Sequence, residues 1–203
     1  MKKNGSAALR QYTSFVLVSA FGLLTGCLYS GDPGHIEPDP DAAASMEGVR
    51  VELIRYSTGC GSAESQGLIV EVGPGVEYPA EVVRALKANC ALVPNPGVEV
   101  HVEDRAVVFD FSNVTEPGRF PDGEFEGYIL DMVRTADAPL LLAALVDRQM
   151  TTLDVVQDDL SFDHDRLAVN LAGRTFDPNS FLRVALYLVE VPDRGDGSAS
   201  DEM

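Results

Sequence analysis

Four aspartates lie close together at residues 158–165, where their carboxylates could bind a metal ion. Asp158, Asp159, Asp163 and Asp165 all fall within these eight residues. Calcium takes six to eight oxygen ligands, and carboxylates on one short loop can converge on a single ion. The four aspartates are therefore a candidate calcium site, although the spacing of an EF-hand loop is absent. The competing interpretation is a solvated acidic loop.

A second acidic group lies at residues 122–126, which contain Asp122, Glu124 and Glu126. A glycosidase needs two carboxylates at a defined separation. A hydrolase-type enzyme that uses loop carboxylates is therefore an alternative function, although the sequence does not single out one pair among its many acids.

Other catalytic chemistry has little support in the sequence. His101 falls on the polar side of an alternating segment, and His164 lies between two aspartates. A general base needs a nucleophile within reach, and the sequence alone cannot place one beside either histidine. The chain also lacks a glycine-rich nucleotide loop, an HExxH pair and a GxSxG elbow. These observations favour a non-enzymatic role.

The segments that must position these groups have mostly the pattern of β-strands. Residues 49–53 and 98–103 alternate between apolar and polar, which is the period of a half-buried strand. Asp104 and Arg105 can turn the second of these into a hairpin with residues 106–111. Further β-rich runs, separated by turn signals, lie at residues 67–72, 125–133, 167–171 and 181–191.

Two segments have ambiguous patterns. Residues 79–89 begin with Pro79 and carry apolar residues three and four apart, which predicts one short helix. Residues 140–146 read LLLAALV, which fits either a helix or a buried strand, and their length and neighbours favour a strand. The sequence therefore predicts a mainly β protein, an antiparallel, jelly-roll-like β-sandwich with one short helix.

The N-terminus has a different composition from the rest of the chain. Three basic residues precede an apolar run of ten residues at 15–24, which is too short to span a bilayer but typical of a signal-peptide core. The run ends in Leu24-Thr25-Gly26-Cys27. In this position, these four residues resemble the lipobox of bacterial lipoproteins.

The resemblance covers residues 1–27 and implies a lipid anchor. A signal peptide of residues 1–26 would be removed, and the sulfur of Cys27 would carry a diacylglyceryl group. Two or three acyl chains anchor a protein far more firmly than one. Leu28, and not an aspartate, follows the cysteine, which by resemblance to Gram-negative sorting favours the outer membrane. The alternative is an uncleaved signal anchor.

The lipobox leaves two further cysteines, Cys60 and Cys90. An exported protein meets an oxidising compartment, where an even pair of cysteines usually forms a disulfide. We therefore expect a disulfide between Cys60 and Cys90, with a catalytic thiol or a metal site as the alternatives.

The expected organisation has a packed domain between two polar segments. Residues 27–47 comprise the acylated cysteine and a proline-rich, acidic stretch that predicts a disordered tether. Residues 48–192 would form the β-sandwich, and residues 193–203 a disordered acidic tail.

Charge narrows the range of partners. The chain has 32 acidic and 15 basic residues, which gives a formal net charge of −17. Three basic residues but no acid precede Cys27, so cleavage before Cys27 would leave a formal net charge of −20. Such a surface repels nucleic acid. The expected partners are membrane lipid, through Cys27, and envelope proteins.

The predicted function is an exported lipoprotein with a binding or envelope-structural role, assisted by calcium; a subunit of an envelope complex is a further alternative.

Overall fold

The protein is described by a computed structural model, and the described residues are 44–60, 67–86, 95–135 and 138–191. Most regular structure in them consists of antiparallel strands, so the predicted mainly β sandwich is confirmed. Met46 is fully buried in the core, and the packed domain therefore begins slightly before residue 48. No helix in these ranges is long and apolar enough to cross a membrane.

One layer of the sandwich is a five-stranded sheet. Its strands, in order from edge to edge, are β2 (Leu68–Glu71), β1 (Arg50–Ser57), β6 (Glu126–Met132), β9 (Arg166–Asn170) and β8 (Leu160–Asp163). β6 is therefore the central strand, and it pairs with β1 on one side and β9 on the other.

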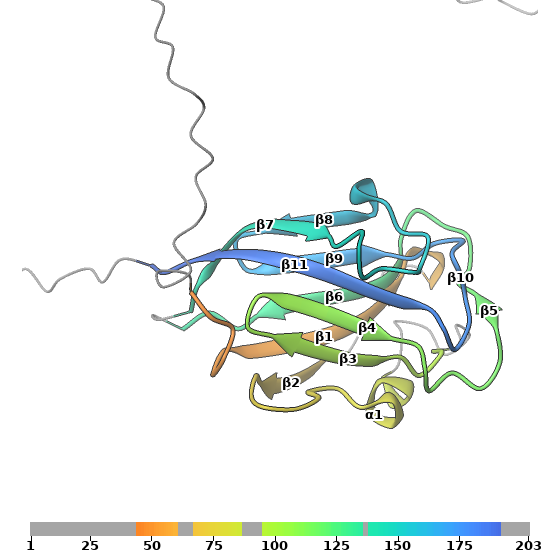
Figure 1. Ribbon diagram of the computed structural model, residues 1–203, viewed down its shortest axis with the longest axis horizontal. Coiled ribbons are helices and arrows are strands. Elements are labelled where there is room, and N and C mark those ends of the chain that lie inside the picture. Colours follow the sequence, from red (N-terminus) through yellow and green to blue (C-terminus); the bar gives the residue numbers. More distant parts are fainter. Residues whose placement is uncertain (1–43, 61–66, 87–94, 136–137, 192–203) are drawn as a thin grey trace, which may run out of the picture. The chain divides into compact units, whose positions relative to one another are not determined.

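The other layer is a four-stranded sheet, shown with the first in Figure 1. Its strands, in order, are β3 (Glu99–Glu103), β4 (Ala106–Asp110), β11 (Phe181–Val189) and β7 (Leu140–Val146). β3 and β4 form the predicted hairpin, with the turn at Asp104 and Arg105. The LLLAALV segment is a strand, as predicted, because β11 pairs along its length.

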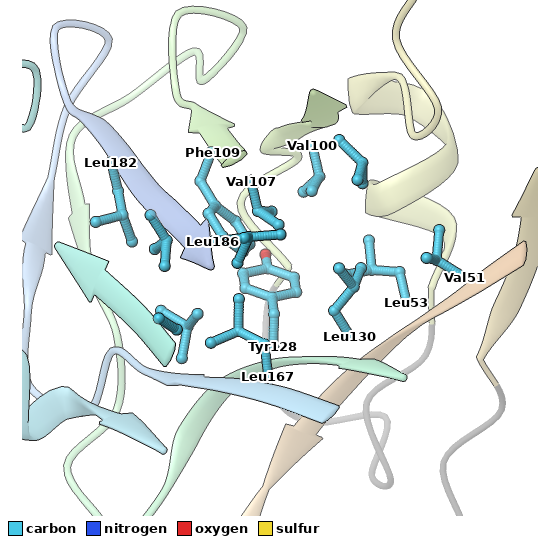
Figure 2. Close-up of a cluster of buried hydrophobic side chains, with 14 of the residues drawn as sticks. Val51, Leu53, Val100, Val107, Phe109, Tyr128, Leu130, Leu167, Leu182 and Leu186 are labelled. Atoms are coloured by element: carbon cyan, nitrogen blue, oxygen red, sulfur yellow. The ribbon is translucent and has the colours of Figure 1, made fainter. Parts of the chain in front are cut away.

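The inward side chains of both sheets form one hydrophobic core (Figure 2). Val51 and Leu53 come from β1, while Phe109 on β4 and Leu182 on β11 face them from the other layer. The ring of Phe109 lies 5.6 Å, centroid to centroid, from the ring of Tyr128 on β6. The alternation that predicted the strands thus also identified the residues that join the two layers.

The single α-helix of the described residues, α1 (Ala80–Ala85), is shorter than the predicted segment of residues 79–89. Pro79 is its N-cap residue, in agreement with the sequence pattern. Leu86 has extended dihedral angles, φ −61° and ψ 120°, so the helix ends at Ala85. The helix packs Val83 into the core.

Three short strands differ from the sequence prediction. β5 (Gly118–Arg119) and β10 (Thr175–Phe176) pair with each other as a small separate sheet. β8 runs through the acidic segment at residues 158–165, which was predicted to be a loop, and that prediction is wrong. β8 is an edge strand of four residues in which Leu160 alone is buried. Its residues do alternate between apolar and polar, but the run is short and lies among clustered aspartates, so the strand signal is weak.

Side chains form hydrogen bonds with backbone groups at both edges of the four-stranded sheet. At the β7 edge, the amide of Gln157 accepts a hydrogen bond from Val146 N (3.1 Å) and donates one to Ala144 O (2.7 Å). At the β3 edge, the carboxylate of Glu77 accepts a hydrogen bond from Val102 N at 2.7 Å. Backbone groups at these positions are therefore already paired.

Gly127 allows β6 and β9 to approach closely, and we expect Gly127→Ala to destabilise the protein. A Cβ at this position would lie 1.9 Å from the carbonyl oxygen of Val169. Overpacking of this kind costs about 1–3 kcal/mol, which urea unfolding would measure. Gly73→Ala is the matched control, because a Cβ there meets nothing within 4 Å. Equal stability of the two variants would contradict the prediction.

Candidate functional site

The structure separates the four aspartates of the predicted calcium site. Asp158 and Asp159 belong to the 3-10 helix η2 (Gln157–Asp159). β8 then follows; Asp163 is its last residue, and Asp165 lies in the turn beyond it. A strand of four residues covers roughly 10–13 Å. The two pairs of carboxylates therefore lie at opposite ends of β8 and do not converge.

Local contacts already engage three of these carboxylates. Asp159 forms an ion pair with Arg174 (Oδ2 to Nη2, 2.7 Å), and Asp165 pairs with Arg134. Asp163 accepts a hydrogen bond from the backbone N–H of the next residue at 2.7 Å. Within the described residues, no group of three or more His, Cys, Asp or Glu side chains is placed to hold a metal ion. The four aspartates are therefore not gathered into one group, and calcium binding stays a prediction.

The second acidic group is also divided, and one member is buried. Asp122 lies on the surface in a two-contact ion pair with Arg119, at 2.8 and 3.1 Å. Glu124 is exposed. Glu126 points into the sandwich and forms a direct ion pair with Arg55. These acids therefore do not face one another as a catalytic carboxylate pair would.

The Arg55–Glu126 pair is almost completely buried between the sheets. Arg55 Nη1 also donates hydrogen bonds to the carbonyl oxygens of Tyr56 (2.8 Å) and Gly127 (2.9 Å). Arg55 Nε has no hydrogen-bond partner among the described residues. A buried ion pair needs such supporting contacts, because removing both charges from water is costly.

Aromatic rings enclose the guanidinium group of Arg55. Its Cζ lies 5.2 Å from the ring centroid of Tyr128 and 5.6 Å from that of Phe120. Burial raises the pKa of Tyr128 to about 12, while the Arg55 charge acts in the opposite direction. The Tyr128 hydroxyl donates a hydrogen bond to Asn95 Oδ1 at 2.8 Å. The polar groups of this part of the core are thus fixed by specific partners.

The sequence contained a signal for this buried pair. Val51 and Leu53 were predicted to face one side of β1, and Arg55 follows at the same alternation. Glu126 likewise lies on the inward side of β6, at the same alternation as Tyr128 and the other buried residues of that strand. A basic and an acidic residue at inward positions of two apolar strands indicate an internal ion pair, but Glu126 was considered only as a member of the acidic group at residues 122–126.

A polar hollow of about 730 Å³ is associated with the small β5–β10 sheet. A volume of this size is within the range of small-molecule sites. The lining combines hydroxyl, amide, carboxylate and guanidinium groups with a few apolar residues, namely Pro117, Gly118, Arg119, Thr152, Leu153, Asp154, Thr175, Phe176, Asp177, Asn179 and Ser180.

The wall of the hollow is connected to the buried pair through aromatic packing. The ring of Phe176, which lines the hollow, lies 5.0 Å from the ring of Phe120, centroid to centroid. Phe120 in turn contacts the guanidinium of Arg55. The inner wall of the hollow is therefore packed against the core, while Asp154 at its surface is exposed.

The two histidines of the domain occupy different environments. His101 Nδ1 lies 2.9 Å from Glu77 Oε2, so His101 makes a contact between its strand and a neighbouring segment. His164 is exposed in the turn between β8 and β9. The contact of His101 helps to hold residue 77 against β3.

The predicted cysteine chemistry lies outside the described residues. Cys27, Cys90 and the side chain of Cys60 are not among them, so acylation and the disulfide stay predictions. No protein-family model matches the chain, and no curated protein or solved structure is detectably similar to it. Function must therefore be argued from the residues of this chain.

Proposed function

We propose that this protein is a bacterial lipoprotein whose β-sandwich is anchored to the outer membrane through acylated Cys27 and acts as a binding or structural module of the cell envelope. One observation carries the proposal. A basic segment, an apolar run of ten residues and Leu24-Thr25-Gly26-Cys27 follow one another in the order of a lipoprotein signal. Leu28 after the cysteine supports the outer membrane as the destination.

The state of the carboxylates supports binding over catalysis. Several of the acids singled out by the sequence are held in ion pairs, such as Asp159 with Arg174 and Glu126 with Arg55. A carboxylate that is already paired with an arginine is not free to act on a substrate. The polar hollow at β5 and β10 combines hydroxyl, amide, carboxylate and guanidinium groups, which suit the recognition of a small polar ligand.

Cys27→Ser should abolish lipid attachment. In cells supplied with labelled palmitate, we expect the wild-type chain to carry the label and to sediment with the outer membrane. The variant should be unlabelled and should leave the membrane fraction if its leader is removed, because a single thioether site holds the acyl chains. Mass spectrometry of the N-terminal peptide would identify the diacylglyceryl group on Cys27.

Cys60→Ser is the matched control for that experiment. It also removes one thiol but should leave palmitate labelling unchanged. Two results would contradict the proposal: label that persists in Cys27→Ser, or a wild-type membrane form that retains residues 1–26. The second result would indicate an uncleaved signal anchor.

A further inference from the structure

An exposed apolar patch lies on the outer face of the four-stranded sheet, where β7 and β11 pair. Register places Tyr187 opposite Ala143, and Ala185 opposite Leu145. A bulge between Tyr187 and Leu188 leaves Leu142 without a partner. Leu142 is 53% exposed, Leu145 43% and Tyr187 45%. The exposed residues Val189 and Val191 continue the row, and together the five form the β7–β11 patch, defined as Leu142, Leu145, Tyr187, Val189 and Val191.

The patch lies on the same end of the domain as the point where the chain enters it. Met46 N donates a hydrogen bond to Asp104 O at 3.1 Å, and Leu186 N donates one to Arg105 O at 2.8 Å. The β3–β4 turn therefore contacts both the first described residues and the strand that carries Tyr187. Figure 1 shows the start of the described chain and the C-terminal end of β11 at one end of the sandwich.

We propose that the β7–β11 patch lies against the lipid surface to which Cys27 is anchored; this inference rests on the proposed function. Seventeen residues lead from Cys27 to Ala44. Even fully extended they reach at most about 60 Å. The anchor thus keeps the patch end of the domain near the bilayer. The high effective concentration of lipid at that position lets even a weak apolar contact form.

The chemistry of the patch fits uncharged or zwitterionic lipid. Leucine and valine side chains can enter the boundary between headgroups and acyl chains, and tyrosine is enriched at that depth in membrane proteins. Glu190, between Val189 and Val191 in the sequence, is exposed, and the whole chain has a formal charge of −17. Anionic lipid would therefore repel the domain.

A single tryptophan can test this contact, because the chain contains none. Leu145→Trp places the probe in the patch. Ile69→Trp places it on β2 of the other sheet, at a residue with a similar exposed fraction of 44%. Each full-length variant, acylated in cells, would be reconstituted into phosphatidylcholine vesicles with brominated acyl chains. We expect shorter-wavelength emission and loss of most fluorescence for Leu145→Trp, and neither effect for Ile69→Trp. Tyr187→Trp is a second patch probe should Leu145→Trp misfold.

Vesicle flotation distinguishes the proposed lipid anchor at Cys27 from the proposed contact between the β7–β11 patch and the lipid surface. If the acylated chain floats with the vesicles but the patch probes keep the emission of the free protein, the anchor stands and the lipid contact is overturned. If both surfaces are quenched equally, the domain has no preferred face and the inference also fails. An emission shift that depends on protein concentration without lipid would indicate a second copy on the patch and would overturn it as well. A chain that carries no acyl group and does not float refutes the proposed function, and the lipid contact with it.

Discussion

Removal of either partner of the Arg55–Glu126 pair should lower the free energy of unfolding by about 3–5 kcal/mol, because the remaining charge would be buried without compensation. Both side chains are enclosed by the core, and aromatic rings occupy the space above the guanidinium. Water cannot readily replace the lost partner. Urea unfolding of Arg55→Met and Glu126→Leu would measure the loss as a lower midpoint.

The double variant Arg55→Met with Glu126→Leu shows whether the single variants lose stability through an uncompensated charge or through altered packing. It removes both charges together and fills much of the volume, so we expect its stability to be close to that of the wild type. An exposed pair provides the control: Arg166 Nε lies 2.6 Å from Asp131 Oδ1 on the surface of β9 and β6. Arg166→Met should cost less than about 1 kcal/mol. Single core variants that cost no more than this control would contradict the prediction.

Stability should fall steeply at alkaline pH because the folded protein holds Tyr128 in its protonated form. Burial raises the pKa of Tyr128 from 10.0 to about 12. The unfolded chain therefore loses the proton first, and the stabilisation present below pH 10 is lost as the pH rises towards about 12. Two pH units correspond to about 2.7 kcal/mol. Burial raises the pKa of Tyr78 as well, and it adds to the same decline.

Urea unfolding on both sides of the ordinary tyrosine pKa would test this dependence. Tyr128→Phe removes the titrating group together with its hydrogen bond to Asn95, so its stability should start lower but decline less with pH. Tyr187→Phe changes an exposed ring and should keep the full decline. If Tyr128→Phe and Tyr187→Phe lose stability with the same slope, Tyr128 is not the cause.

The strands that could be predicted from sequence are those with one buried and one open face. β3 shows this, since its alternation was visible, and the Asp104-Arg105 turn then indicated β4 as its hairpin partner. β8 was missed because its alternation covers only four residues, from Leu160 to Asp163, and these lie among clustered acids. Acid content instead indicated a loop, and pairing with β9 outweighed it.

The candidate site was harder to predict than the fold, because proximity in sequence was taken for proximity in space. The aspartates at 158–165 are neighbours along the chain, yet a strand separates them. Arg55 and Glu126 are far apart along the chain, yet the pairing of β1 and β6 brings them together. The alternation of each strand marks both residues as inward-facing, but the strand pairing and register are needed to show that they meet. The hollow at β5 and β10 depends on two-residue strands that no sequence pattern indicates.

The side-chain caps on the sheet edges have a consequence for a protein confined to a membrane plane. Anchored molecules meet at high local density and in a shared orientation, conditions under which bare strand edges template intermolecular β-pairing and aggregation. At the β7 edge, Gln157 occupies Ala144 O and Val146 N, and at the β3 edge Glu77 occupies Val102 N. A neighbouring molecule would have to displace these side chains before it could add a strand. If the chain is anchored as proposed, Gln157 and Glu77 would therefore hinder intermolecular β-pairing at the backbone positions that they occupy.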